Sequence, residues 1–463
     1  MDVNFQKELI DYISKNKIKP TCKVVTFGCQ MNAKDSEKIL GILISSGFEE
    51  IDDEQKADFV IYNTCTIREN ANQKLYGHIG QLKNSYYNNK NKIIAICGCM
   101  MQEEGEIDKI KNKFPFVKLV FGTHNLYKFE EYLYDSFVNK KKIFEVYNDN
   151  KIIKEDIPKK RKYSFKCGIN ISFGCNNFCS YCIVPFVRGR EKSRSSKDII
   201  NEIKSVVKDG VIEVMLLGQN VNSYGNDFRI ENINELSFPE LLKEVSKING
   251  LKRIRFMTSH PKDFSDELIE VIKNNKNIAR HIHLPVQSGS NKILKLMNRN
   301  YSREYYIELS KKIKESISDI SLTTDIIVGF PGETEEDFLD TIDLINEVKF
   351  SQVFTFEYSK RKGTKAYEMD NQIPNDIVKK RFDKLLDTVE ESANYNIIKK
   401  IGSIEEVLIE SINNSTNNCT ARLSNNFLVH FNNNSNHIGE LVNVKFNESK
   451  GFYYIGELVN GIE

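Results

Sequence analysis

Short apolar runs alternate with segments of helical spacing along most of this chain, and this alternation limits the folds that it can adopt. The first runs occupy residues 23–27, 58–62 and 92–97, and the segment 36–46 between them carries apolar residues at helical spacing. Strands that alternate with helices predict a parallel sheet. We therefore expect an open parallel α/β domain at residues 20–137.

The same rhythm returns with a longer period in the middle of the chain. Its six apolar runs are 169–173, 212–217, 253–257, 281–285, 322–328 and 353–356. Six successive β–α units predict a partial (β/α)6 barrel of the TIM type, with its site loops at the carboxyl ends of the strands. We place this domain at 161–392. The segments that follow the runs are polar and rich in glycine, as in a cofactor pocket.

The last part of the chain has a different pattern. Four short alternating runs are separated by turns rich in Asn, Ser and Gly, at 406–410, 427–431, 441–446 and 452–457. This spacing predicts a small antiparallel β-barrel, which we place at 395–463. The lysine-rich segment 138–160 is expected to be a linker between the first two domains.

Three cysteines lie on one short predicted loop after the run 169–173. Cys175, Cys179 and Cys182 have the spacing C-x3-C-x2-C. Three thiolates can hold three irons of a cubane iron–sulfur cluster and leave the fourth iron open to a small molecule. The alternative is a structural zinc site, which needs four ligands and would use Cys167 as the fourth.

A second set of three cysteines is dispersed in the first domain. Cys29, Cys65 and Cys99 each lie just beyond a predicted strand. The carboxyl ends of parallel strands meet at one edge of the sheet, so these thiols are expected to converge and to suit a second cluster. Small buried cysteines in tight turns are the alternative. Cys97 competes with Cys99 for the role, but Cys99 follows Gly98 at the strand end.

Composition restricts the cellular context more than the activity. The formal net charge of +2 neither indicates nor excludes a nucleic-acid partner, and the 10 cysteines favour metal ligation over disulfides in a cytoplasmic chain. No apolar run approaches the ~20 residues that span a bilayer, so we expect a soluble, cytoplasmic protein. The basic residues that follow the cysteine loop are candidates for contacts with RNA phosphates: Arg188, Arg190, Lys192 and Arg194.

Several motifs carry a resemblance to a known family. The segment 174–182 resembles the cluster motif of radical S-adenosylmethionine (SAM) enzymes, and the C-terminal barrel resembles a TRAM domain, although Ala421-Arg422 stands where Gly-Arg is usual. The segments 26–32, 63–68 and 98–102 resemble the methylthiotransferase family. The resemblance covers residues 23–458. Within the family, four segments are most similar to the branch that modifies a dimethylallyl-bearing adenosine in tRNA: 183–194, 217–225, 255–261 and 297–301.

The resemblance implies an activity and a set of cofactors. Two [4Fe-4S] clusters would be held by the two cysteine sets, and SAM would be consumed while N6-(dimethylallyl)adenosine next to the tRNA anticodon becomes its 2-methylthio derivative. The implied partners are the tRNA anticodon stem-loop and an electron donor such as flavodoxin or ferredoxin, and the chain is expected to be a monomer. No catalytic residue is expected beyond the cluster ligands. Candidate SAM-pocket residues are Gln219, Asn220, Ser288 and Arg361.

Two other readings of the chain stay open from the sequence. The same chemistry could act on threonylcarbamoyl-adenosine in tRNA or on a ribosomal protein. A non-catalytic RNA-binding protein with structural zinc is the more remote alternative, and it gives no reason for the polar loops after the barrel strands.

Overall fold

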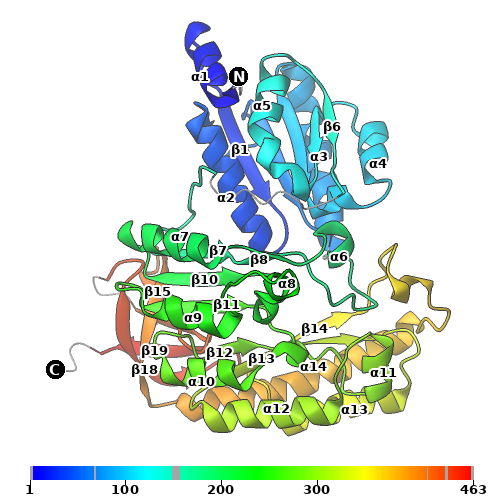
Figure 1. The fold of residues 1–463 in the computed structure, drawn as a ribbon, viewed down its shortest axis with the longest axis vertical. Coiled ribbons are helices and arrows are strands. Elements are labelled where there is room, and N and C mark those ends of the chain that lie inside the picture. The colour runs from blue at the N-terminus through cyan, green and yellow to red at the C-terminus, as the bar shows by residue number, and fades with distance from the viewer. Residues whose placement is uncertain (1–3, 67–68, 149–156, 414, 433–435, 460–463) are drawn as a thin grey trace. The chain divides into compact units, whose positions relative to one another are not determined.

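The computed structural model describes residues 4–66, 69–148, 157–413, 415–432 and 436–459 (Figure 1). The chain forms two compact units. The first contains Met1–Lys162, Phe173–Asn176 and Ile183–Lys192, and the second contains Tyr163–Ser172, Asn177–Cys182 and Ser193–Glu463. Among the described residues, no helix is both long and apolar enough to cross a bilayer.

The first unit is built on a six-stranded sheet in the order β2-β1-β3-β4-β5-β6, and every neighbouring pair is parallel. Its strands are β1 (Thr21–Thr26), β2 (Glu49–Glu50), β3 (Phe59–Thr64), β4 (Ile93–Gly98), β5 (Leu119–Phe121) and β6 (Ile143–Glu145). Its longer helices are α1 (Phe5–Lys15), α2 (Gln30–Ser45), α3 (Glu69–Asn88), α4 (Glu106–Lys113) and α5 (Phe129–Phe137). The predicted parallel α/β domain is confirmed.

Helices cover both faces of this sheet. Phe59 and Ile61 of β3 belong to an apolar cluster with residues of α1, α2 and α5, whereas Val60 and Tyr62 belong to a second cluster with residues of α3 and α4. Strands that are buried on both faces have continuous apolar sequences, which explains the runs seen in the sequence. The strand β6 falls inside the segment 138–160 that we predicted as a linker, so this prediction is wrong for that part; residues 149–156 lie outside the described ranges.

The second unit contains six parallel strands in two sheets of three, ordered β11-β10-β7 and β12-β13-β14. A parallel bridge between Ile254 and Ile278 connects the two sheets, so the strands follow one another in chain order as a partial (β/α)6 barrel. The strands are β7 (Lys166–Asn170), β10 (Glu213–Leu217), β11 (Arg253–Met257), β12 (His281–His283), β13 (Ser321–Val328) and β14 (Gln352–Glu357). The principal helices are α7 (Ser196–Lys208), α9 (Phe238–Ser246), α10 (Asp266–Asn274), α12 (Arg303–Ser316), α13 (Glu335–Val348) and α14 (Asn375–Ile397).

The C-terminal part of the second unit is a closed barrel in the order β15-β16-β17-β19-β18. Its strands are β15 (Ile404–Asn413), β16 (Asn418–Leu423), β17 (Leu428–Asn432), β18 (Leu441–Ser449) and β19 (Tyr453–Leu458). The predicted small β-barrel is confirmed, with two additions. Strand β16 was not predicted, because its inward residues Cys419 and Ala421 are small and give little apolar pattern. The pair β17–β19 is parallel, whereas the other pairs are antiparallel.

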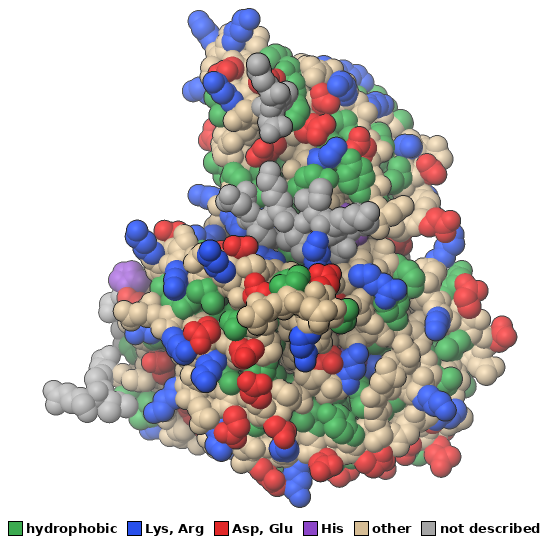
Figure 2. Space-filling view, viewed as in Figure 1, with side chains coloured by type: hydrophobic (Ala, Val, Ile, Leu, Met, Phe, Trp, Pro, Cys, Tyr) green, Lys and Arg blue, Asp and Glu red, His purple; other side chains and the backbone are tan. Residues whose placement is uncertain are grey.

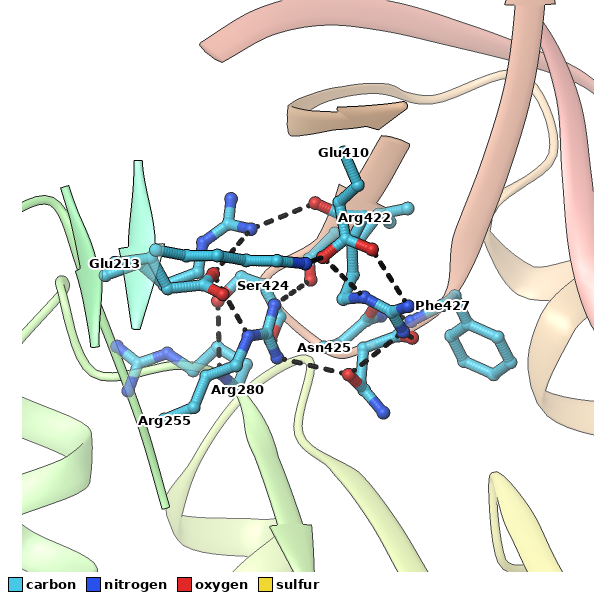
Figure 3. A network of polar contacts seen from close by, with 12 residues as sticks. Glu213, Arg255, Arg280, Glu410, Arg422, Ser424, Asn425 and Phe427 are labelled. Carbon is cyan, nitrogen blue, oxygen red and sulfur yellow. Dashed lines mark hydrogen bonds and ion pairs between the residues drawn. The ribbon is translucent and has the colours of Figure 1, made fainter. Parts of the chain in front are cut away.

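A polar network fixes this five-stranded barrel to the N-terminal ends of the core strands (Figure 3). Arg255 donates from Nη2 to the carbonyl of Leu423 at 2.6 Å, from Nη1 to the carbonyl of Ser424 at 3.2 Å, and from Nε to Glu213 at 3.1 Å. Glu213 is the first residue of β10, and Arg253, the first residue of β11, donates to the carbonyl of Arg422 at 2.9 Å. The opposite, C-terminal ends of the strands are therefore the ends with loops available for a site.

Charged side chains of both signs are interspersed on the face shown in Figure 2, in keeping with the formal net charge of +2. A large surface of one sign attracts polyanions over long distances, and a mixed surface does not. The face in Figure 2 therefore has no large surface of one sign, and on this face only local groups of basic residues could attract a polyanion.

Candidate functional site

Three strand ends in the first unit position the cysteines of the dispersed set. Cys29 precedes the first residue of α2, Cys65 directly follows β3, and Cys99 directly follows β4. Oδ1 of Asn32 lies near Sγ of both Cys29 and Cys99, and a β-carbon added to Gly28 would lie 2.5 Å from Cβ of Cys65. The structure thus brings these three side chains together at the carboxyl edge of the sheet, as parallel topology requires.

Asn32, in the first turn of α2, connects the turns that carry these cysteines. Its Oδ1 lies 3.5 Å from Sγ of Cys29 and 3.9 Å from Sγ of Cys99. Its Nδ2 donates to the carbonyl of Thr64 at 2.7 Å, next to Cys65. Asn32 lies in the segment 26–32, which resembles the family, but nothing in the sequence indicated that its side chain would connect the turns that carry the cysteines.

Arg188 also belongs to the first unit, and it contacts one of these thiols. Its Nε lies 2.9 Å from Sγ of Cys99, its Nη1 lies 3.1 Å from Oδ2 of Asp35, and its Nη2 lies 2.9 Å from Oδ1 of Asn32. Only 6% of Arg188 is exposed. The predicted contact of Arg188 with an RNA phosphate is therefore corrected, because its donors face internal acceptors.

The other basic candidates divide into two groups. Arg194 is buried, donates to the carbonyl of Asn170 at 2.6 Å and forms an ion pair with Glu202 at 2.9 Å, so its predicted phosphate contact is also corrected. Arg190 is exposed and Lys192 is partly exposed. These two side chains are the members of the predicted set that solvent reaches.

Burial opposes the ionisation of Cys97 and Cys99. It raises the pKa of Cys99 to about 12, and the neighbouring charge of Arg188 acts in the opposite direction. Cys97 packs with Ile93 and Ala95 in the apolar layer on one face of the sheet, and burial raises its pKa well above the usual value. The arrangement therefore favours Cys99 over Cys97 as the third member of the set, and it gives this member a cationic neighbour.

The C-x3-C-x2-C loop follows β8 (Ser172–Phe173) and precedes α6 (Val184–Val187). Cys175 belongs to the first unit, where its backbone N–H donates to the carbonyl of Gly189 at 3.2 Å. Cys179 and Cys182 belong to the second unit, where the N–H of Cys182 donates to the carbonyl of Cys179 at 2.9 Å. This backbone turn brings Cys179 and Cys182 close together on one short segment.

The segment 297–301 packs against this loop within the second unit. Arg299 donates from Nη1 toward Sγ of Cys179 at 3.5 Å and from Nε to the hydroxyl of Tyr301 at 2.8 Å, and it also donates to the carbonyl of Pro285. Asn298 donates to the carbonyl of Phe178 at 3.0 Å. From the sequence alone this segment served only as a family marker, because nothing in it indicated a contact 120 residues away.

A structural zinc site would need Cys167 as its fourth ligand, and the position of Cys167 does not support this role. This residue lies on β7, where it packs in the apolar core with Ile169 and Val214. Within the described part of the chain, no three His, Cys, Asp or Glu side chains are grouped around one point as ligands of a single metal ion. Zinc ligands all bind one ion, whereas the thiolates of a cubane cluster bind different irons and stand farther apart.

Buried polar atoms gather at the C-terminal ends of β7, β10 and β11. Both side-chain polar atoms of Asn170 and one side-chain oxygen of each other member have no hydrogen-bond partner among the described residues. The members of this group are Asn170, Ser172, Asn220, Thr258 and Ser259. A buried polar atom without a partner costs ~1–3 kcal/mol, so such a group is expected where a polar ligand binds. This observation fits a polar cofactor such as SAM.

The four predicted SAM-pocket residues differ in their relation to this group and in their burial. Asn220 belongs to it, and its Nδ2 donates to Asp263 at 2.7 Å, while Gln219 precedes it in the loop after β10. Ser288 is fully buried, with its hydroxyl 3.4 Å from that of Thr341. Arg361 is partly exposed in the loop after β14.

Three family descriptions match the chain. The Radical SAM superfamily matches residues 169–345, the Uncharacterized protein family UPF0004 matches residues 21–122, and the TRAM domain matches residues 399–459. A solved radical SAM methyltransferase, TsrM from Kitasatospora setae with cobalamin and a [4Fe-4S] cluster bound, is similar with a TM-score of 0.54 at 13% identity, over 76% of this chain and 77% of that one. At that identity the similarity shows the fold alone.

Curated relatives match almost the whole chain. The tRNA-2-methylthio-N(6)-dimethylallyladenosine synthase of Lachnoclostridium phytofermentans is 55% identical over 441 residues, which is 95% of each chain. The enzyme of the same name from Clostridium tetani is 50% identical over 442 residues, 95% of this chain and 97% of that one. With both cysteine sets, the partial barrel and the C-terminal barrel in place, the chain belongs to the family of tRNA-2-methylthio-N(6)-dimethylallyladenosine synthases.

Proposed function

We propose that this chain is a radical SAM tRNA methylthiotransferase, which converts N6-(dimethylallyl)adenosine next to the anticodon into its 2-methylthio derivative. The observation that carries the proposal is the convergence of Cys29, Cys65 and Cys99 in a chain that also has the C-x3-C-x2-C loop. A binding protein without catalysis needs neither set. Relatives of 55% and 50% identity that bear this activity in their names support the same substrate.

Cys29, Cys65 and Cys99 would hold one [4Fe-4S] cluster, with an open iron for the sulfur that is transferred. The donor set fits such a group, because three thiols converge and the guanidinium of the buried Arg188 donates a hydrogen bond to one of them. Asn32 and the strand-end turns fix the positions of the thiols. Their contribution is to orient the ligands before the cluster is bound.

Cys175, Cys179 and Cys182 would hold the other [4Fe-4S] cluster, at whose open iron SAM binds. When bound, this pair supplies the radical chemistry needed to open a strong C–H bond of an adenine ring. Asn170, Ser172 and Thr258 carry polar atoms that a bound SAM would satisfy. Gln219, Asn220, Ser288 and Arg361 remain candidates for the same pocket.

The tRNA would present its adenosine from the unpaired anticodon loop, because specific RNA recognition favours unstacked bases. The solvent-accessible Arg190 and Lys192 are the candidates for phosphate contacts. In the C-terminal barrel, Arg422 forms a two-point ion pair with Glu410, at 3.0 Å for both contacts, so other residues of this barrel would meet the RNA. We further propose that the enzyme is a cytoplasmic monomer that receives electrons from flavodoxin or ferredoxin.

Mass spectrometry of tRNA nucleosides tests the substrate. We expect the 2-methylthio group on dimethylallyl-adenosine to disappear in a strain that lacks this chain and to return with the wild-type gene, but not with a Cys99→Ala gene. Loss of the methylthio group from threonylcarbamoyl-adenosine instead would assign the chain to that substrate. Unchanged tRNA together with a change in a ribosomal protein would assign it to the protein substrate.

A further inference from the structure

Each of the two cysteine sets has one buried arginine that faces one of its thiols. In the first unit, Nε of Arg188 lies 2.9 Å from Sγ of Cys99. In the second unit, Nη1 of Arg299 lies 3.5 Å from Sγ of Cys179. We propose that Arg188 and Arg299 are positioning residues, one for each cluster, that stabilise a ligand thiolate and set the reduction potential of that cluster. This inference rests on the proposed function.

The neighbours of Arg188 hold its guanidinium so that one edge faces a cysteine sulfur. Asp35 and Asn32 take Nη1 and Nη2, and both residues lie on the same face of α2 because they are three positions apart. Burying a charged arginine is costly unless each donor has a partner. The third nitrogen, Nε, donates to Cys99. The helix α2 therefore holds Arg188 in the one orientation that delivers a hydrogen bond to this thiol.

Arg299 has a different set of neighbours. It donates to the hydroxyl of Tyr301 and to the carbonyl of Pro285, both of which are neutral. No carboxylate lies within ion-pair distance of Arg299 in the described ranges, although only 7% of the residue is exposed. A buried guanidinium without an anion is strongly unfavourable, so a negative group is expected next to it. The thiolate of Cys179, bound to iron, is the anion at hand.

The two arginines should therefore act on the reduction potentials in different ways. Hydrogen bonds and positive charge next to a ligand sulfur stabilise the reduced, more negative form of a cluster and raise its reduction potential. Arg188 is neutralised by Asp35, so its contribution is mainly the hydrogen bond to Cys99 and the screening of Asp35 from the thiols. Arg299 has no carboxylate partner in the part of the chain that the structure describes, so its contribution to the potential includes its full charge.

Redox titration of each cluster by itself tests the proposal. The variant Cys175→Ala/Cys179→Ala/Cys182→Ala retains only the cluster of the first unit, and Cys29→Ala/Cys65→Ala/Cys99→Ala retains only the other. After anaerobic reconstitution, iron and sulfide are counted and the midpoint potential is followed by electron paramagnetic resonance. We expect Arg188→Gln to make the potential more negative in the first background alone, and Arg299→Gln to do so in the second alone.

Matched variants separate this role from a general loss of structure. Arg188→Lys keeps the charge but loses the guanidinium geometry, so it should recover only part of the shift. Arg188→Gln/Asp35→Asn also removes the carboxylate that Arg188→Gln leaves uncompensated; it should hold a full cluster, and its potential should stay more negative than that of the background. Arg422→Gln breaks an ion pair in the C-terminal barrel and should leave both potentials unchanged.

The outcomes distinguish this inference from the function on which it rests. If both triple variants bind clusters but Arg188→Gln and Arg299→Gln leave their potentials unchanged, the roles assigned to the arginines are wrong and the function stands. A shift of both potentials by either single arginine variant would equally overturn the one-to-one assignment. If the reconstituted chain holds zinc and no sulfide, the proposed function itself fails.

Discussion

Gly28 packs directly against Cys65: a β-carbon on Gly28 would lie 2.5 Å from Cβ and 3.0 Å from Sγ of Cys65. Gly28 also has a φ of +123°, which side chains rarely adopt. The glycine at the end of β1 thus sets the space in which the thiol of the neighbouring strand end lies.

We expect Gly28→Ala to displace the Cys65 thiol and to remove the cluster of the first unit, so that iron falls from about eight to about four per chain, as for two cubanes reduced to one. Gly47→Ala is the matched control. Gly47 also has a positive φ, of +94°, but its nearest neighbour would be Ile13 at 3.5 Å, an ordinary contact. Full iron content in Gly28→Ala would show that the turn does not position Cys65.

Removing either complete cysteine set should halve the metal content. Because the two sets come from separate parts of the chain, each triple alanine variant is expected to retain about four irons and matching sulfide after anaerobic reconstitution. Iron and sulfide assays give the result. Loss of all iron from one triple variant would mean that one cluster assembles only when the other is present.

Arg255→Ala should strongly destabilise the second unit. It leaves the buried carboxylate of Glu213 without this partner, and removing one member of a buried ion pair typically costs ~3–5 kcal/mol. Urea unfolding of the metal-free protein measures the free energy of unfolding. Arg229→Ala, at an exposed arginine, should stay within about 0.5 kcal/mol of wild type. Equal stability of the two variants would show that the network of Figure 3 contributes little.

Stability should decline as the pH falls below ~6.5, the usual pKa of histidine in an unfolded chain. Burial holds the pKa of His281 well below its usual value, and the charges of Arg255, His283 and Arg422 act in the same direction. The unfolded state then binds a proton that the folded state does not, so this histidine lowers the free energy of unfolding by up to ~1.4 kcal/mol per pH unit.

Urea unfolding of the metal-free protein between pH 7 and pH 5 checks this dependence. His281→Asn should reduce the slope of stability against pH, because the titrating group is gone. His437→Asn, at an exposed histidine of the C-terminal barrel, is the control. A slope in His281→Asn equal to that of wild type would contradict the prediction.

The sequence predicted the positions of Cys29, Cys65 and Cys99 because parallel topology alone decides them. Once an apolar run is recognised as a buried strand, the residue after it must lie at the carboxyl edge of the sheet. The strands β2, β5 and β6 escaped prediction because two or three residues carry no periodicity. Strand β16 escaped because its inward side chains are small.

Arg188 could not be predicted in the same way. A run with Arg188, Arg190, Lys192 and Arg194 is typical of a solvated surface, and the contact of Arg188 with Asp35 joins residues 153 positions apart. Only tertiary structure shows that two members of the run, Arg188 and Arg194, turn inward. The one hint in the sequence was Asp35, an acidic residue three positions after Asn32. Because Asp35 is buried on α2, its charge requires a partner, and Arg188 supplies it.

The contact of Arg255 with the carbonyls of Leu423 and Ser424 also decides how molecules enter the core. The five-stranded barrel covers the N-terminal ends of the core strands, whereas the buried polar atoms of Asn170 and Ser172 lie toward the C-terminal ends. One end of the strands thus anchors a neighbouring domain, and the other end is left for the exchange of small molecules.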